Sequence, residues 1–134
     1  MTPQINQPLK NTQFSDQLVD NDWGLFFRET SALSPQEKTA RLRGVADDVA
    51  FINGFDMSEP LSHKNHQHSG ALRQIFISVY TRPGHEFYLS TDFEKAAGAF
   101  EAFDRNGRHL GEWLFSGSKN GDADGSGHHD IIVR

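Results

Sequence analysis

Two short segments near the carboxy-terminal end are rich in large apolar residues and are separated by a tight turn. Residues 99–104 and 108–115 flank Arg105-Asn106-Gly107. Asn-Gly between two such segments is a strong short-range signal for a β-hairpin. The hairpin brings its two strands side by side, so we expect Glu101 of the first strand to lie close to His109 of the second. This pair is the starting point for assigning a function.

A helix is predicted upstream, from Pro35 to about Ile52. Ser34 is a suitable N-cap, Pro35 suits the first helical position, and Glu37 stands where a capping box needs it. Apolar residues then recur at helical spacing, and Asn53-Gly54 ends the pattern. We expect this helix to pack on a sheet.

The hydrophobic period changes to two at Leu72, which predicts strands from there onward. We expect a twisted antiparallel sheet of four to five strands within residues 72–133, its last strand at Asp130–Val133. The intervening residues 56–70 are predicted to form a loop. The fold class is therefore α+β.

A chain of 134 residues fits a single domain. We divide it into a loose arm (1–13), a helical part (14–55) and a sheet part that carries the candidate site (72–134). It contains no cysteine, which excludes disulfides, thiolate metal sites and a thiol nucleophile. No segment resembles a signal peptide or has the ~18–20 apolar residues of a membrane span. We expect a soluble monomer that neither contacts a membrane nor uses a cofactor.

The net charge of −5 is spread along the chain. Broad nucleic-acid binding usually needs a positive surface that neutralises phosphates, so this composition argues against it. It does not exclude a small RNA-cutting site, because seven histidines could add local positive charge.

Two segments contain residue types that bind metals. The first has three histidines at positions 63, 66 and 68, and we interpret it as a polar surface loop in preference to a zinc or nickel site. The second, residues 120–131, matches the first half of a calcium loop, but Ile131 stands where a bidentate Glu is needed. We interpret it as a flexible Asp/Gly turn, and we assign no metal ligands.

The residues on and around the hairpin suit acid–base cleavage of RNA. That reaction needs a base for the ribose 2′-hydroxyl, an acid for the leaving oxygen and a cation for the phosphorane charge. The alternative is that Glu101 and His109 form an ordinary cross-strand pair on a solvated face. The candidate set is Glu94, Lys95, Glu101, His109, His128 and His129.

About half of the chain resembles the carboxy-terminal cytotoxic ribonuclease domain of the ribosome-inactivating colicins and of related contact-dependent and Rhs polymorphic toxins. The most specific segment is Gly107-Arg108-His109-Leu110-Gly111-Glu112. The other matching residues are Leu61-Ser62, Asn65, Arg73–Phe76, Tyr88, Glu94, Gly98, Phe100-Glu101 and His129-Asp130-Ile131. Known members of this family cut an RNA backbone, the founding ones in the decoding centre of 16S ribosomal RNA.

The resemblance implies roles for individual residues. Glu94 stands at the acid of the family, Glu101 at the Glu that acts as base or orients it, and His129 at the terminal cation. We assign substrate binding to Arg73, Lys95, His109 and His128. Ala97 stands where the family has its His, and losing that imidazole should cost about 10²–10⁴-fold in rate. The alanine is either a deliberate inactivation or a natural divergence.

The leading hypothesis is therefore a ribonuclease toxin domain of an interbacterial competition system, inactive or impaired with Ala97. It would act in the cytoplasm of the target cell on ribosomal RNA or tRNA, and a cognate immunity protein would bind it. The acidic balance is a departure that puts the ribosome in doubt. Two alternatives stay open: a non-enzymatic binding protein such as a toxin-neutralising immunity protein, and a metal-binding domain that uses the histidine segment.

Overall fold

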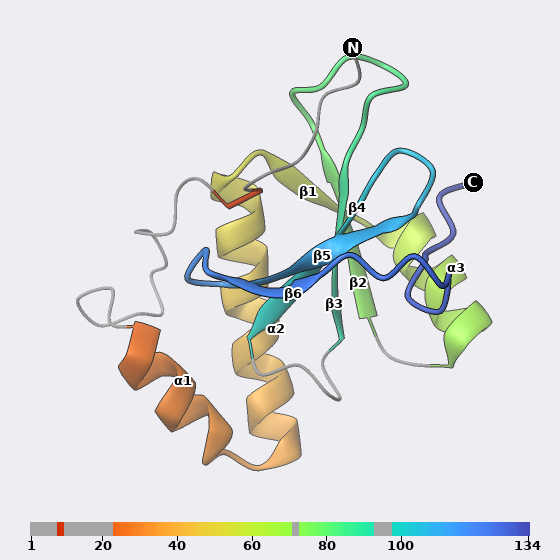
Figure 1. Ribbon diagram of the computed structural model, residues 1–134. Coiled ribbons are helices and arrows are strands. Elements are labelled where there is room, and N and C mark those ends of the chain that lie inside the picture. The colour runs from red at the N-terminus through yellow and green to blue at the C-terminus, as the bar shows by residue number, and fades with distance from the viewer. Residues whose placement is uncertain (1–7, 10–22, 71–72, 93–97) are drawn as a thin grey trace.

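The computed structural model describes residues 8–9, 23–70, 73–92 and 98–134. The predicted arm up to residue 7, most of the predicted segment before Trp23, and the site candidates Glu94, Lys95 and Ala97 lie outside these residues. The described chain contains three helices and six strands (Figure 1). In chain order these are α1 Trp23–Ser31, α2 Pro35–Ile52, β1 Phe55–Ser58, α3 Glu59–Ser69, β2 Arg73–Ser78, β3 Tyr88–Asp92, β4 Ala99–Phe103, β5 His109–Leu114 and β6 Lys119–Asp122.

The six strands form one antiparallel sheet in which each strand pairs with its neighbours in sequence, in the order β1 to β6. The α+β class is confirmed, but the sheet has more strands than the four to five predicted. The additional strands are β1 and β6, each four residues long. Such short segments give almost no alternation to detect.

Both faces of the sheet are covered in its middle. On the first face, α1 and α2 pack against Phe76, Phe100 and Trp113 in the larger core. On the second face, Phe103 packs with Ile131 of the carboxy-terminal segment in a smaller core, which also contains Ile75 and Tyr88 and touches Leu61 of α3. Glu101 shares this second face with Phe103, so the candidate site lies on the part of that face that the terminal segment leaves uncovered.

Helix α2 has the bounds predicted from its local signals. The Ser34 hydroxyl oxygen accepts a hydrogen bond from the backbone N–H of Glu37, and the same hydroxyl donates to the Glu37 carboxylate at 2.9 Å. Its buried residues, including Leu42, Val45 and Val49, face the larger core. The capping residues and the apolar stripe indicate the same helix bounds, so this helix could be predicted from the sequence.

The prediction of a loop over residues 56–70 is wrong, because β1 and α3 occupy this segment. The Ser58 side chain caps α3, Pro60 stands in its first turn, and Gly70 ends it in the left-handed conformation. Within α3 only Asn65 is buried. A helix without an apolar stripe gives no helical period, so only its caps could reveal it.

The prediction of a strand at Asp130–Val133 is also wrong, since these residues are not paired in the sheet. A side chain of α3 takes the place of a neighbouring strand. The Asn65 amide oxygen accepts from the backbone N–H of Ile132, and its amide nitrogen donates to the Ile132 carbonyl, both at 2.9 Å. The backbone N–H of Ile131 donates to the Gly107 carbonyl at 2.9 Å. The terminal segment is thus tied to both α3 and the hairpin turn.

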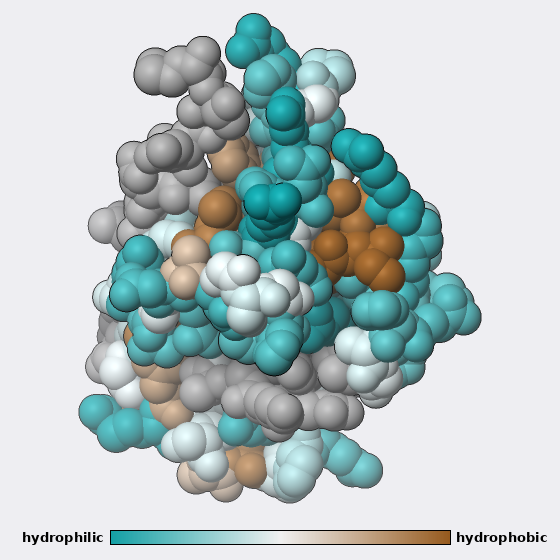
Figure 2. Space-filling model, turned by 45° about the vertical axis from the view of Figure 1, so that its right-hand side comes forward, coloured by the Kyte–Doolittle hydropathy of each residue, from teal (hydrophilic) through white to brown (hydrophobic). Residues whose placement is uncertain are grey.

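The surface on the side of α3 and the carboxy terminus is largely hydrophilic, with hydrophobic residues gathered in small areas (Figure 2). Among the described helices, none combines the length and the apolar character needed to cross a membrane.

The turn at Gly107 should be intolerant of any side chain. Gly107 has φ +82°, and a Cβ built there would collide with the Ile131 carbonyl oxygen. Gly84 has a nearly identical φ of +83° with open space around it, so Gly84→Ala is a matched control. We expect Gly84→Ala to cost about 1–2 kcal/mol of unfolding free energy, from the backbone alone. Gly107→Ala should cost about 2 kcal/mol more in urea denaturation, because the terminal segment must also move. Equal losses for the two variants would contradict the contact with Ile131.

Candidate active site

A β-bulge in β5 decides which way His109 points. Ala102 pairs with Gly111, but the next residue, Phe103, pairs with His109, so Leu110 is left without a partner. A one-residue shift moves a side chain to the opposite face. The bulge therefore places His109 on the second face with Phe103 and Glu101, whereas strict alternation along β5 would place it on the first face with Trp113.

Glycine makes this bulge possible. Gly111, directly after the unpaired Leu110, has φ +144°, a conformation that side chains disfavour. A Cβ there would stand 2.8 Å from the carbonyl oxygen of Gly121 on β6. The Gly-x-His-Leu-Gly-Glu segment thus provides both the imidazole and the backbone that aims it.

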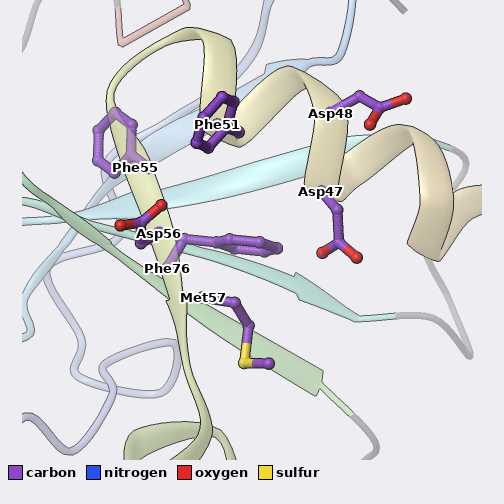
Figure 3. Close-up of a pocket in the computed structure, with 7 residues that line it drawn as sticks. All are labelled: Asp47, Asp48, Phe51, Phe55, Asp56, Met57 and Phe76. Atoms are coloured by element: carbon purple, nitrogen blue, oxygen red, sulfur yellow. The ribbon is translucent and has the colours of Figure 1, made fainter. Parts of the chain in front are cut away.

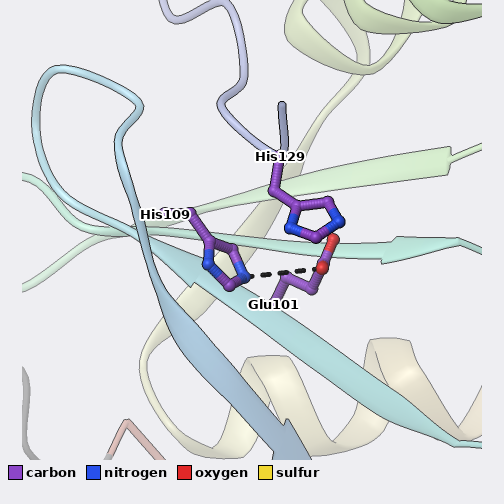
Figure 4. A group of neighbouring side chains, drawn as sticks. All are labelled: Glu101, His109 and His129. Carbon is purple, nitrogen blue, oxygen red and sulfur yellow. Dashed lines mark ion pairs between the residues drawn. The ribbon is translucent and has the colours of Figure 1, made fainter. Parts of the chain in front are cut away.

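Three side chains from different parts of the sequence meet on this face (Figure 4). Glu101 comes from β4, His109 from β5 and His129 from the terminal segment. The His109 Nε2 lies 3.4 Å from the Glu101 carboxylate, and the two imidazole ring centroids are 5.0 Å apart. The side chain of His109 is only 4% exposed, whereas those of Glu101 and His129 are 25% and 53% exposed. Solvent and any substrate therefore reach Glu101 and His129, and His109 lies beneath them.

Hydrogen bonds from the terminal segment hold His109 in place. The backbone N–H of Asp124 donates to its Nδ1 at 2.9 Å, and its own backbone N–H donates to the Asp130 carboxylate at 2.9 Å. Because Nδ1 accepts a hydrogen bond, the proton of the neutral ring is on Nε2. That N–H faces the Glu101 carboxylate, but among the described residues the buried Nε2 has no hydrogen-bond partner.

A carboxylate orients His129. Its Nδ1 donates a hydrogen bond, whereas the Nδ1 of His109 accepts one. The His129 Nδ1 lies 3.0 Å from Asp124 Oδ2, so Nδ1 is the donating nitrogen and Nε2 is left for another group. Asp124 also accepts from the backbone N–H of Ser126 at 2.9 Å. This hydrogen bond is the main cause of a lowered pKa of the Asp124 carboxyl, to which Ser126's side chain, His129 and His128 add. Asp124 therefore stays ionised beside His129.

The same three residues have the distances of a metal site, since their ligand atoms lie within 4.8 Å of one another. The hydrogen bonding of His109 argues against that use. A metal ligand His normally donates its other ring N–H to an acceptor. Here the other nitrogen, Nδ1, already accepts a hydrogen bond, so a metal at Nε2 would require a ring stripped of both protons. The arrangement favours proton transfer between acid and base over metal binding.

A cavity of about 430 Å³ opens beside His109. It lies between the hairpin turn and the terminal segment, and its lining includes Arg108, Leu110 and Ser126. The three carboxylates on its wall already accept hydrogen bonds from the protein: Asp104 from Asn106 and Arg108, Asp124 from Ser126, and Asp130 from His109.

The predicted site residues fall into three groups. Glu101, His109 and His129 come together as predicted. Arg73 alternates onto the same face as Ile75 and lies two strands from Glu101, about 10 Å across the sheet. His128 is exposed and lies near Asp124, outside the cluster. The remaining candidates, Glu94, Lys95 and Ala97, lie outside the described residues. The metal alternative at positions 63, 66 and 68 is placed on α3, and no described cluster of potential ligands includes them.

Two functional residues were not assigned from the sequence. Asp124 and Asp130 both hold imidazole-bearing residues in place. The Asp/Gly-rich segment could have indicated these two residues. Asp side chains between small residues commonly accept hydrogen bonds from backbone N–H groups of the same loop.

The Asp124–His129 pair should appear in the acid dependence of stability. The folded-state pKa of Asp124 is lowered, so its stabilising contribution is present above the ordinary carboxyl pKa of about 3.9 and is lost as pH falls through the lowered value. Asp124→Asn should therefore be less stable than the native chain at about pH 6, and the difference should shrink below about pH 4. Urea denaturation at several pH values measures this difference. Asp122→Asn, at a side chain 95% exposed, is the control. A gap between native and Asp124→Asn that stays constant with pH would contradict the assignment.

The site thus consists of a partly exposed carboxylate, an exposed imidazole with its own carboxylate, and a buried imidazole beneath them. No protein-family model matches the chain, and neither a curated protein nor a solved structure matches it. What the chain does is therefore inferred from the chemistry of these side chains.

Proposed function

We propose that the chain is a ribonuclease domain that cleaves an RNA backbone by acid–base transesterification. The observation that carries the proposal is the convergence of Glu101, His109 and His129 on one open sheet face, where Asp124 holds His109 through its backbone N–H and His129 through its carboxylate. A carboxylate and an imidazole that can both be reached from solvent supply a base and an acid.

The reaction assigns one role to each exposed group. Glu101 removes the proton of a ribose 2′-hydroxyl, and the 2′-oxygen attacks the adjacent phosphorus. The bond from phosphorus to the 5′-oxygen breaks as His129 donates a proton to that oxygen. The products are a 2′,3′-cyclic phosphate and a free 5′-hydroxyl. Asp124 supports His129 by holding its Nδ1, which directs Nε2 away from Asp124 and toward the substrate.

His109 is a positioning residue in this scheme. It is buried, and its Nε2–H faces Glu101 at 3.4 Å, so it acts on the substrate only through the carboxylate. An imidazole N–H directed at the base from beneath can close to a hydrogen bond and hold the carboxylate toward the substrate. The unpaired state of this buried donor is costly for folding, which is typical of a group kept for function.

Arg73 is the candidate cation for the phosphate. It lies on the same face as Glu101, and its guanidinium Nε is buried without a hydrogen-bond partner in the described chain. A guanidinium matches two phosphate oxygens at once. The buried hydroxyl of Ser90, on β3 directly across from Glu101, is on the same face and also lacks a hydrogen-bond partner among the described residues.

The biological setting rests on the resemblance to cytotoxic domains. That resemblance is strongest at residues 107–112, the segment that provides His109 and the bulge. It supports a toxin of interbacterial competition, with RNA as substrate and an immunity protein as cognate partner. The acid–base set is present apart from the family's central imidazole, where this chain has Ala97, so we propose an impaired rather than a fully active enzyme.

Removing the carboxylate base should abolish cleavage. We expect Glu101→Gln to lower the cleavage rate of purified RNA about 10²–10⁴-fold, because the amide cannot accept the 2′-hydroxyl proton. The assay is gel analysis of the fragments, with their 3′ ends tested for a 2′,3′-cyclic phosphate. Cleavage should persist in EDTA and fail on RNA with 2′-O-methyl groups.

The control is Asp122→Asn, which likewise turns a carboxylate into an amide, at a side chain that is 95% exposed and outside the cluster, and it should leave the rate within about twofold. His109→Gln tests positioning. It should lower the rate less than Glu101→Gln does and displace the pH dependence of cleavage, a readout that a purely structural residue would not move. Equal rates for Glu101→Gln and the native chain would refute the mechanism.

Restoring the imidazole expected by family resemblance should increase activity. Ala97→His should raise the cleavage rate about 10²-fold or more, because it returns the proton carrier that the family has at this position. Expression in bacteria should then become toxic and yield a discrete RNA fragment. Ala96→His, which puts the same ring one position away, is the control and should have little effect. If Ala97→His is harmless and leaves cellular RNA intact, the chain is not a disabled member of that family.

A further inference from the structure

The exposed hydrophobic side chains of the described chain are gathered in one place. Phe51, Ile52, Met57, Val79 and Tyr80 are the large hydrophobic residues with exposed side chains, and Phe51 and Tyr80 are 74% and 90% exposed. They come from the end of α2, from β1, and from the two residues after β2. The turn at Gly54 joins them: its carbonyl accepts from the N–H of Val79 at 2.9 Å, and the ring of Tyr80 lies over it. A contiguous patch of this kind marks an interaction surface.

A hollow of about 340 Å³ lies within this patch, between α2 and β1 (Figure 3). Aromatic rings form much of its wall: Phe51 from α2, Phe55 from β1, and Phe76 from β2. The rings of Phe55 and Phe76 are buried and therefore fixed, whereas Phe51 projects from the helix end. The buried rings give the hollow a rigid wall, and Phe51 is the ring that a bound group can reach and that can adjust to it.

The charges around the hollow are of one sign. Asp47, Asp48 and Asp56 line it, and no Lys or Arg does. Asp47 extends from α2 toward the strands, whereas Asp48 points away from them (Figure 3). Burial against this wall raises the pKa of the Asp47 carboxyl; the nearby Arg43 lowers it and Asp48 raises it further. A carboxylate beside an accessible aromatic ring is suited to a cation.

We propose that the α2–β1 hollow is a docking site for a basic segment of a partner protein, which inserts an arginine side chain. A guanidinium is planar, stacks on an aromatic ring and pairs with carboxylates, so it uses both features of the hollow at once. The surrounding apolar side chains give the rest of the segment a surface to cover. A purely apolar partner would cover the carboxylates of Asp47 and Asp56 without supplying a positive charge to pair with them.

This surface is separate from the candidate active site. Phe76 belongs to the core of the first sheet face, whereas Glu101 and His109 lie on the second. A partner bound at the hollow therefore leaves the catalytic face open. The inference does not depend on the ribonuclease proposal, and the two are tested separately.

The test is an NMR titration of the full ¹⁵N-labelled chain with a blocked tri-arginine peptide. We expect saturable shifts confined to the amides around residues 47–57 and 76–80. A tri-citrulline peptide, nearly identical in shape but uncharged, should give none. The double variant Asp47→Asn/Asp56→Asn should weaken binding about tenfold, and Phe51→Ala, at an exposed position, about threefold. RNA cleavage by these variants should be unchanged.

Controls separate this site from general attraction to an acidic protein. Asp122→Asn removes one charge at an exposed position outside the hollow and should weaken binding less than twofold. Equal shifts with tri-citrulline, or equal weakening by Asp122→Asn, would overturn the proposal. Shifts of the same amides on dilution without peptide would also overturn it, because the occupant would then be a second copy of the chain.

Discussion

The site depends on the bulge at Leu110 in β5. One unpaired residue reverses the faces of the strand before it, and His109 consequently lies over Phe103 instead of beside Trp113 in the larger core. The bulge requires Gly111, because its φ and the nearby Gly121 carbonyl leave no room for a side chain. The irregular backbone at this position therefore holds the His109 imidazole at a defined place beneath the Glu101 carboxylate.

The terminal segment completes what the bulge begins. It brings His129 over His109, and it provides the backbone N–H and the carboxylate that fix the buried imidazole. Its own attachment relies on Asn65, which satisfies both the N–H and the C=O of Ile132. An amide side chain can do this because it carries a donor and an acceptor, as a peptide group does. The helix α3 is thus necessary for the site although its histidines take no part in it.

The sequence predicted those elements whose signals are local. Helix α2 has a cap, a first-turn proline, an apolar stripe and a stop, and its bounds agree with the structure. The hairpin turn at Arg105-Asn106-Gly107 brought Glu101 and His109 together, as expected. The bulge has no local signal beyond a glycine, and α3 has no apolar period. Ile131 and Val133 both pack against the smaller core and so have the alternating apolar pattern of a strand. The sequence pattern does not distinguish a backbone that pairs with a strand from one that pairs with an asparagine side chain. Long-range contacts of this kind cannot be deduced from spacing alone.

Among the described residues, the meander order makes β1 and β6 the two edge strands of the sheet. An unpaired edge is a template for adding strands from another copy, and proteins limit this risk with short edge strands and charges. Both edges here are four residues long, and they carry Asp56 on one side and the Lys119–Asp122 ion pair on the other. Extension of the sheet into an aggregate is therefore disfavoured at each end. Asp56 would consequently have two roles. Its charge opposes the addition of a strand at β1, and its carboxylate lines the hollow that we propose binds a basic side chain.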